Sequence, residues 1–183
     1  MDLVHEDLLL EAGCGAGMLL GPLSVHVHKI VGVDYAYSMV KRCKSLFPQL
    51  DVITAEVRKL PFHKDTFDKI VCFSVFQYFP DLEYAKEVLV EFIRVCRWGG
   101  RVFIGDVPDE KAKAASLNYR QKVGEHVGWR SSIKADLHHI YYKRKFFKNF
   151  LEDRGIKCTI SQQDIPGYGN SPFRFNVVFE NRK

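Results

Sequence analysis

Three glycines at alternate positions, Gly13, Gly15 and Gly17, follow an apolar run that begins at Leu8, in the stretch LLLEAGCGAGMLL. Glycine lets a chain turn sharply after a strand and brings bare backbone against a ligand. Asp34 comes 21 residues after Gly13, at the end of the next apolar run. A carboxylate at that place can accept hydrogen bonds from both hydroxyls of a ribose. The two features together predict a site for a nucleotide-like ligand.

The spacing of the loop separates two classes of ligand. A dinucleotide-binding loop needs a glycine at position 18 to seat a pyrophosphate on the following helix, and this chain has Met18 there. Glu11 stands in the apolar run before the glycines, where burying a carboxylate is costly unless something pairs with it. A ligand ammonium, a cluster of backbone amides and solvent at the rim of a sheet are the candidate partners. The pattern E-x-G-x-G-x-G therefore argues against a dinucleotide.

Strands and helices alternate in the part of the chain that carries these residues. Short apolar segments predict strands covered on both faces at residues 8–12, 30–33, 52–55, 70–73 and 102–104. Amphipathic stripes predict a helix over 37–47, stopped by Pro48, and another that begins after Asp81 and ends at Gly99. This alternation predicts a parallel sheet with helices on both faces, whose ligands bind at the carboxyl ends of the strands.

The chain changes character after Pro108. Residues 111–139 are polar and weakly periodic, whereas residues 146–151 give a short helical face. The last segment alternates apolar and polar side chains: Phe173, Arg174, Phe175, Asn176, Val177, Phe179 and Glu180. Such alternation is typical of a half-covered strand, and the turn-rich PGYGNSP separates it from an apolar run at 156–160. We expect these two segments to form an antiparallel hairpin that closes the sheet.

Composition and length bound the class of protein. The chain has 183 residues, of which 46% are hydrophobic and 27% charged, as in an ordinary single globular domain. Its apolar runs are too short to span a bilayer and its first residues are acidic, so a soluble cytoplasmic protein is expected. The five cysteines are scattered singly without zinc-ligand spacing, which predicts no metal site. The net charge of +5 favours an anionic partner only weakly, and nucleic acid is not expected.

Four stretches in this order resemble the class I S-adenosylmethionine-dependent methyltransferases, in particular the small-molecule group called type 11. They are LLLEAGCGAG, VGVDYAYSMV, AEVRKLPFHKDTFDKIVCFSVFQYFPD and RVCRWGGRVFIGDV, and they cover residues 7–107. The resemblance implies a Rossmann-like, doubly wound, mostly parallel α/β sheet of seven strands with an antiparallel C-terminal hairpin. It implies one methyltransferase domain over 1–183, with a cofactor-binding core at 1–107, a lid-like insert at 108–140, and a C-terminal helix and hairpin at 141–183.

The same resemblance implies a site for S-adenosyl-L-methionine and its product S-adenosyl-L-homocysteine. At the methionine end, the loop from Gly13 to Gly17 would wrap the cofactor and Glu11 would lie beneath it, fixing the loop and the amino group. Ser74 would offer its backbone carbonyl to the methionine ammonium. This chain has Gln77 and Tyr78 where the family often has a histidine pair facing the methyl group. The residues expected at this end are Glu11, Gly13, Cys14, Gly15, Gly17, Ser74 and Tyr78.

At the adenosine end, Asp34 would hold the ribose hydroxyls, with Tyr35 and Met39 beside the adenosine. Glu56 would meet the adenine amino group, where the family usually has aspartate. Val57 would contact a neighbouring ring nitrogen through its backbone.

The expected function is transfer of a methyl group to an O or N atom of a small molecule. The end of the chain faintly resembles methyltransferases that act on sugars or saccharides. The stretch SVFQYF replaces the N/D-P-P-Y/F motif of enzymes that methylate base amines. No catalytic base is assigned, although the segment after the fifth strand offers candidates: Tyr119, His126, Trp129, His138 and His139.

Two alternatives stay open. One is an NAD-dependent oxidoreductase on the same kind of sheet, against which Met18 and the C-terminal hairpin argue. The other is a cofactor-binding but non-catalytic regulatory protein, because about six residues precede the first strand where the family has one or two covering helices. The expected partner is a small-molecule methyl acceptor, without a membrane, and a homodimer is the candidate assembly.

Overall fold

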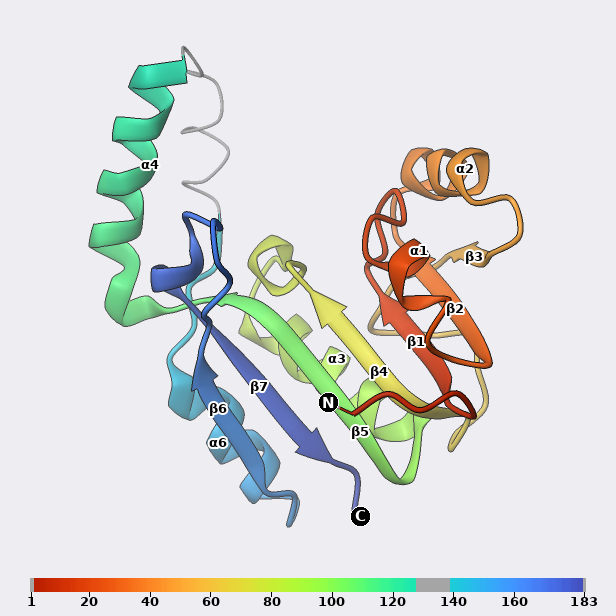
Figure 1. Ribbon diagram of the computed structural model, residues 1–183. Helices are drawn as coiled ribbons and strands as arrows, with labels where there is room; N and C mark the ends of the chain where they lie inside the picture. The colour runs from red at the N-terminus through yellow and green to blue at the C-terminus, as the bar shows by residue number, and fades with distance from the viewer. Residues whose placement is uncertain (1, 128–138, 183) are drawn as a thin grey trace.

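The computed structural model describes residues 2–127 and 139–182 of the chain, which form a seven-stranded sheet (Figure 1). The strands lie in the order β3-β2-β1-β4-β5-β7-β6. Their bounds are Leu8–Ala12 (β1), Lys29–Asp34 (β2), Asp51–Thr54 (β3), Phe67–Phe73 (β4), Cys96–Pro108 (β5), Cys158–Gln162 (β6) and Arg174–Glu180 (β7). The first five strands pair in parallel, and β7 pairs antiparallel with both β5 and β6. The predicted α/β sheet and its antiparallel hairpin are confirmed.

Helices cover both faces of this sheet. Their bounds are Leu20–Leu23 (α1), Tyr37–Leu46 (α2), Leu82–Val95 (α3), Lys113–Val127 (α4) and Arg144–Glu152 (α6), with short 3-10 turns at Phe76–Tyr78, Glu110–Ala112 and Ser171–Phe173. The helices α3 and α6 lie behind the sheet in Figure 1 and enclose the larger apolar core. A smaller core lies on the opposite face, where α1 and α2 pack against the strands β1 to β3. The apolar stripes of the sequence are thus the buried faces of these helices.

Several predicted boundaries are wrong. β4 begins at Phe67 rather than at 70, and β6 spans Cys158–Gln162 rather than 156–160. The helix that begins after Asp81 ends at Val95 rather than at Gly99, because the chain is already extended at Cys96 and pairs there with Phe67. The strand β5 is therefore 13 residues long instead of the short run expected at 102–104. Gly99 still marks a turn, but one inside the irregular start of the strand, where its φ is +73° and its N–H donates to Asn181.

The segment after β5 contains a helix that the sequence did not predict. α4 spans Lys113–Val127 and stands away from the sheet in Figure 1, beside the connection between β6 and β7. Most of its described side chains are exposed, so it lacks the apolar period that reveals a packed helix. The first residue of β7 also departs from the expected alternation. Arg174 is 1% exposed, whereas a half-covered strand would place it on the solvent side.

Candidate functional site

The glycine loop after β1 is held against the end of β2 by its own backbone. Gly13 and Cys14 both donate to the carbonyl of Val33, at 2.7 and 2.9 Å. The N–H of Gly15 donates to Oδ2 of Asp34 at 2.8 Å, and Ala36 donates to Oδ1 at the same distance. Asp34 therefore fixes the loop. Its carboxylate also has acceptor positions left for the hydroxyls of the expected ribose, because the two backbone N–H groups occupy only part of its lone pairs.

The three loop glycines differ in the space around them. All have positive φ, but a Cβ on Gly13 would collide with the side chain of Val75, and one on Gly17 would lie 2.5 Å from Sγ of Cys43. A Cβ on Gly15 would meet nothing within 4 Å. Gly13 and Gly17 are therefore required by packing. At Gly15 the loop borders open space, where a bound ligand could contact its backbone.

Alanine substitution separates these roles. Gly13→Ala is expected to destabilise the fold by about 2–3 kcal/mol because it combines a positive φ with a clash. Gly15→Ala should cost only about 1 kcal/mol, yet weaken cofactor binding at least tenfold because its methyl group would fill the cradle. Thermal unfolding and calorimetric titration with S-adenosylhomocysteine measure the two quantities. The assignment is wrong if Gly15→Ala binds as tightly as the unsubstituted protein.

Glu11 is a buried carboxylate beneath the loop. It is 3% exposed, and its Oε2 atom has no hydrogen-bond partner. Burial, with a further contribution from the negative charge of Asp34, raises the pKa of Glu11 to about 8. A carboxyl group in this state gains from a cationic partner that would restore its charge. It fits the ammonium that the sequence analysis placed here.

Exposed apolar side chains surround the end of β2. Tyr35 is 76% exposed and Met39 44% exposed, and Tyr37 and Met18 nearby are also mostly exposed. Their exposure leaves Tyr35 and Met39 available to a ligand at the end of this strand. Cys14 differs from these residues, because it is buried in the smaller core, where its thiol donates to the carbonyl of Gly15 at 3.8 Å.

Glu56 and Val57 follow β3 in a segment that α3 holds in place. Glu91 of α3 accepts from the Leu60 N–H at 2.6 Å, and Arg94 donates to carbonyls of the same segment. Val57 is buried in the larger core, so its side chain is engaged in packing. The Glu56 carboxylate is half-exposed and accepts from Arg58 at 2.7 Å. This ion pair borders a shallow hollow lined by Glu56, Arg58, Lys59 and Glu87.

The end of β4 brings Ser74 to the same edge of the sheet. Ser74 has a φ of +61°, and its carbonyl accepts from Nε2 of Gln77 at 2.9 Å. A carbonyl has two lone pairs, so one stays available for a ligand donor. Tyr78 is 68% exposed, and its ring lies 5.0 Å from that of His139 in an edge-to-face arrangement. Trp129, His138 and the side chain of His126 lie outside the described residues.

Sequence reasoning missed a buried polar network at the end of β5. Asp106 is fully buried, and its partners come from the connection between β6 and β7, which includes Tyr168, and from β7 itself, which includes Arg174. The only signal in the sequence was an aspartate closing a strand. Its partners lie 57 or more residues further along the chain, so no local pattern could reveal them.

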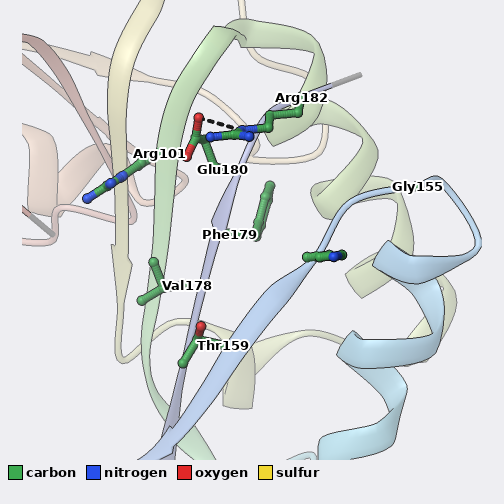
Figure 2. A pocket seen from close by; sticks show the side chains of 8 residues that line it. Arg101, Gly155, Thr159, Val178, Phe179, Glu180 and Arg182 are labelled. Carbon is green, nitrogen blue, oxygen red and sulfur yellow. Dashed lines mark hydrogen bonds and ion pairs between the residues drawn. The ribbon is translucent and has the colours of Figure 1, made fainter.

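A second hollow lies at the opposite edge of the sheet (Figure 2). It is lined by Arg101, Gly155, Lys157, Thr159, Val178, Phe179, Glu180 and Arg182. Its one acidic side chain is engaged by the neighbouring guanidinium, Arg182 to Glu180, at 2.8 Å. The hollow is remote from the carboxyl ends of the parallel strands and has none of the features of the glycine loop. Among the described residues, no group of His, Cys, Asp and Glu is arranged to hold a metal ion.

Comparison with known proteins places this site in a family. A family model described as "Methyltransferase domain" matches residues 10–104, from the strand before the glycine loop to the middle of β5. The chain belongs to this methyltransferase domain family. The match spans the loop, Asp34, Glu56 and Ser74, and so covers both expected ends of the site.

Individual relatives are more distant. Chondramide synthase cmdD of Chondromyces crocatus is 34% identical over 106 residues, which is 54% of this chain and 3% of the synthase. A probable S-adenosylmethionine-dependent methyltransferase of Mycolicibacterium smegmatis is 29% identical over 101 residues, 55% of this chain and 38% of the relative. The matches thus span less than half the length of these relatives.

The fold is shared more widely than the sequence. A putative methyltransferase solved in complex with the Haloferax volcanii Trm112 activator superposes with a TM-score of 0.74 at 18% identity, covering 100% of this chain and 86% of that one. No helix among the described residues is both long and apolar enough to cross a membrane.

Proposed function

We propose that this chain transfers a methyl group from S-adenosylmethionine to an O or N atom of a small molecule. One arrangement carries the proposal: the glycine loop, open at Gly15, lies between the unpartnered carboxyl oxygen of Glu11 and the carboxylate of Asp34. The first carboxyl suits an ammonium and the second suits a ribose. They stand at the ends of adjacent strands, as one ligand with both groups requires.

The chemistry needs alignment more than acid or base catalysis. The sulfonium of the cofactor supplies an already activated methyl group. The chain's residues have to hold the cofactor in the glycine loop, orient the acceptor in line with the methyl carbon and exclude water. A base is needed only for an acceptor that must lose a proton. Ser74, Gln77 and Tyr78 stand at the strand end beside the loop, where they border the expected position of the methyl group.

Calorimetric titration with S-adenosylhomocysteine tests the cofactor half of the proposal. We expect saturable binding at one site per chain, and no such binding of a nicotinamide dinucleotide. An absence of heat from folded protein would refute it, and preferential binding of the dinucleotide would favour the oxidoreductase. Methyl transfer from labelled cofactor to a panel of hydroxyl- and amine-bearing metabolites then tests turnover. A protein that binds cofactor but methylates no member would instead be a cofactor-binding regulator.

A further inference from the structure

Two neighbouring strands end in residues with left-handed backbone. Ser74 after β4 has a φ of +61° and Asp106 near the end of β5 has a φ of +59°. Neither is glycine, and strained backbone of this kind collects at functional sites. The two are adjacent in space, because the N–H of Ser74 donates to the carbonyl of Gly105 at 3.1 Å. The end of β5 therefore belongs to the same edge of the sheet as the expected methyl position.

A bulge in the sheet turns Asp106 out of the strand ladder. The pairing of β5 with β7 shifts between Ile104 and Val107, where Gly105 and Asp106 together oppose Asn176. Bulges of this type re-aim a side chain and are frequent beside active sites.

Side chains take over the hydrogen bonds that the bulge removes from the ladder. The Asp106 N–H donates to Oε1 of Gln163 and to Oδ1 of Asn176, both at 3.1 Å. The Asp106 carboxylate accepts from Nε2 of Gln163 at 3.0 Å and from the hydroxyl of Tyr168 at 3.1 Å. The Asp106 side chain is thus held by two neutral donors from the connection between β6 and β7.

Arg174 is the cation of this network and is incompletely satisfied. Its Nε lies 3.5 Å from Oδ1 of Asp106, and the residue is 1% exposed. Neither Nε nor Nη1 of Arg174 has a hydrogen-bond partner. Burying guanidinium donors without acceptors is costly, and an oxygen that accepted from them would recover that cost. Carboxylate and phosphate oxygens make the strongest such bonds because both partners are charged.

The order of strands places this guanidinium on the acceptor side. Glu56 follows β3, Asp34 ends β2, the glycine loop follows β1 and Ser74 follows β4, so the expected cofactor runs across the sheet from adenine to methionine. The next two strands in the sheet are β5 and β7, which carry Asp106 and Arg174. Tyr168 is only half-buried and gives the network its more accessible end.

We propose that Asp106 and Arg174 form the acceptor-binding end of the site, with Arg174 binding a carboxylate or phosphate group of the methyl acceptor. This inference rests on the proposed function, because the anionic ligand is a methyl acceptor only if the protein transfers methyl groups. Asp106 orients the guanidinium through its ion pair with Nε, Gln163 and Tyr168 orient Asp106, and an anionic oxygen of the acceptor accepts from Nη1 of Arg174. The acceptor's nucleophilic atom then lies toward Ser74 and the glycine loop.

The test adds benzoate, phenyl phosphate and neutral benzamide to the 183-residue chain, with and without S-adenosylhomocysteine. The backbone amide of Asp106 and the Nε–H of Arg174 are followed by NMR. We expect at least one anion to shift both signals saturably and benzamide to shift neither. The tighter anion tells a carboxylate-bearing acceptor from a phosphorylated one. Equal shifts with benzamide, or no saturable shift with either anion, would overturn the inference.

Matched variants locate the binding. Arg174→Lys should weaken the anion at least tenfold, read at the Asp106 amide, whereas Arg182→Lys, which changes an exposed arginine at the opposite edge, should leave it unchanged. Undiminished binding in Arg174→Lys contradicts the inference. If that variant does not fold, the Arg174 Nε–H signal of the unsubstituted protein decides alone. Anion binding at Arg174 without any binding of S-adenosylhomocysteine would refute the proposed function and leave the anion site standing, and the reverse result would refute only the anion site.

Discussion

Glu11→Gln is expected to stabilise the protein in alkaline solution and to weaken its hold on the cofactor. In the folded chain the pKa of Glu11 is raised to about 8 by burial and by Asp34, whereas in the unfolded chain it returns to the ordinary 4.5. Between pH 4.5 and about pH 8, Glu11 is therefore protonated in the folded chain and ionised in the unfolded chain. The Glu11 contribution to stability therefore falls as the pH rises through this interval, and glutamine, which does not titrate, removes the fall.

The size of this effect follows from the width of the interval. Between about pH 5 and about pH 9 the variant should gain about 4 kcal/mol over the unsubstituted protein, or roughly 8–16 °C in melting temperature. Thermal unfolding of both proteins across that range measures it. Burial also raises the pKa values of the Cys14 and Cys72 thiols above their ordinary 9.0. Both proteins contain these thiols, so the comparison between them largely removes the thiol contribution near pH 9. Parallel melting curves for the two proteins at all pH values would contradict the buried, unpartnered state of Glu11.

The same carboxyl makes cofactor binding depend on pH. An ammonium beside Glu11 favours the ionised form, so binding below about pH 8 releases a proton. The affinity for S-adenosylhomocysteine should rise by as much as tenfold for each pH unit between about pH 6 and about pH 8, and Glu11→Gln should flatten this rise. Calorimetry in buffers of different ionisation enthalpy counts the released proton directly. A pH-independent affinity in the unsubstituted protein would place the ammonium elsewhere.

The parts of the fold that sequence predicts well are those where one local pattern decides the structure. The strand at Leu8–Ala12 agrees with its predicted range, and β2 and β3 begin and end within a residue of theirs, because each is a short apolar run bounded by polar or turn-forming residues. Asp81 caps α3 as expected, since its side chain accepts from the Tyr84 N–H. The helix end near Gly99 failed because pairing of Cys96 with β4 overrode the local glycine signal.

The candidate site likewise contains residues that a local sequence pattern predicts and residues that it cannot predict. The glycine loop and Asp34 are read from spacing alone, because 21 residues take the chain from one strand end through a helix to the next strand end. Asp106 and Arg174 could not be read this way. Their meaning depends on a bulge and on a pairing between β5 and β7, which only the folded sheet brings together. The alternation in β7 predicted that Arg174 is exposed, and this is wrong. A pattern of residue types places every charged residue on the solvent side, so it cannot distinguish a buried arginine from an exposed one.

Asp34→Ala should remove most of the cofactor affinity and also loosen the loop that forms the site. Each oxygen of Asp34 already accepts one backbone bond, Oδ2 from Gly15 and Oδ1 from Ala36, both at 2.8 Å. A carboxylate offers about four acceptor positions, so two are left for the two hydroxyls of a ribose. Alanine removes all of them. We expect an affinity loss of at least tenfold for S-adenosylhomocysteine, and about 1–2 kcal/mol less stability because two N–H groups lose their acceptor.

Two further variants separate the ribose from the loop. Asp34→Asn keeps one acceptor oxygen and can hold one backbone N–H, so it should recover part of the stability while binding the cofactor poorly, since one oxygen cannot serve the loop and two hydroxyls. Asp51→Ala changes an exposed aspartate on the adjacent strand that pairs with Lys29, and should leave affinity unchanged. Adenosine, which has the ribose but no methionine, should lose affinity in Asp34→Ala as the full cofactor does. If adenosine binds equally well to the unsubstituted protein and to Asp34→Ala, the carboxylate serves the loop alone and the ribose is held elsewhere.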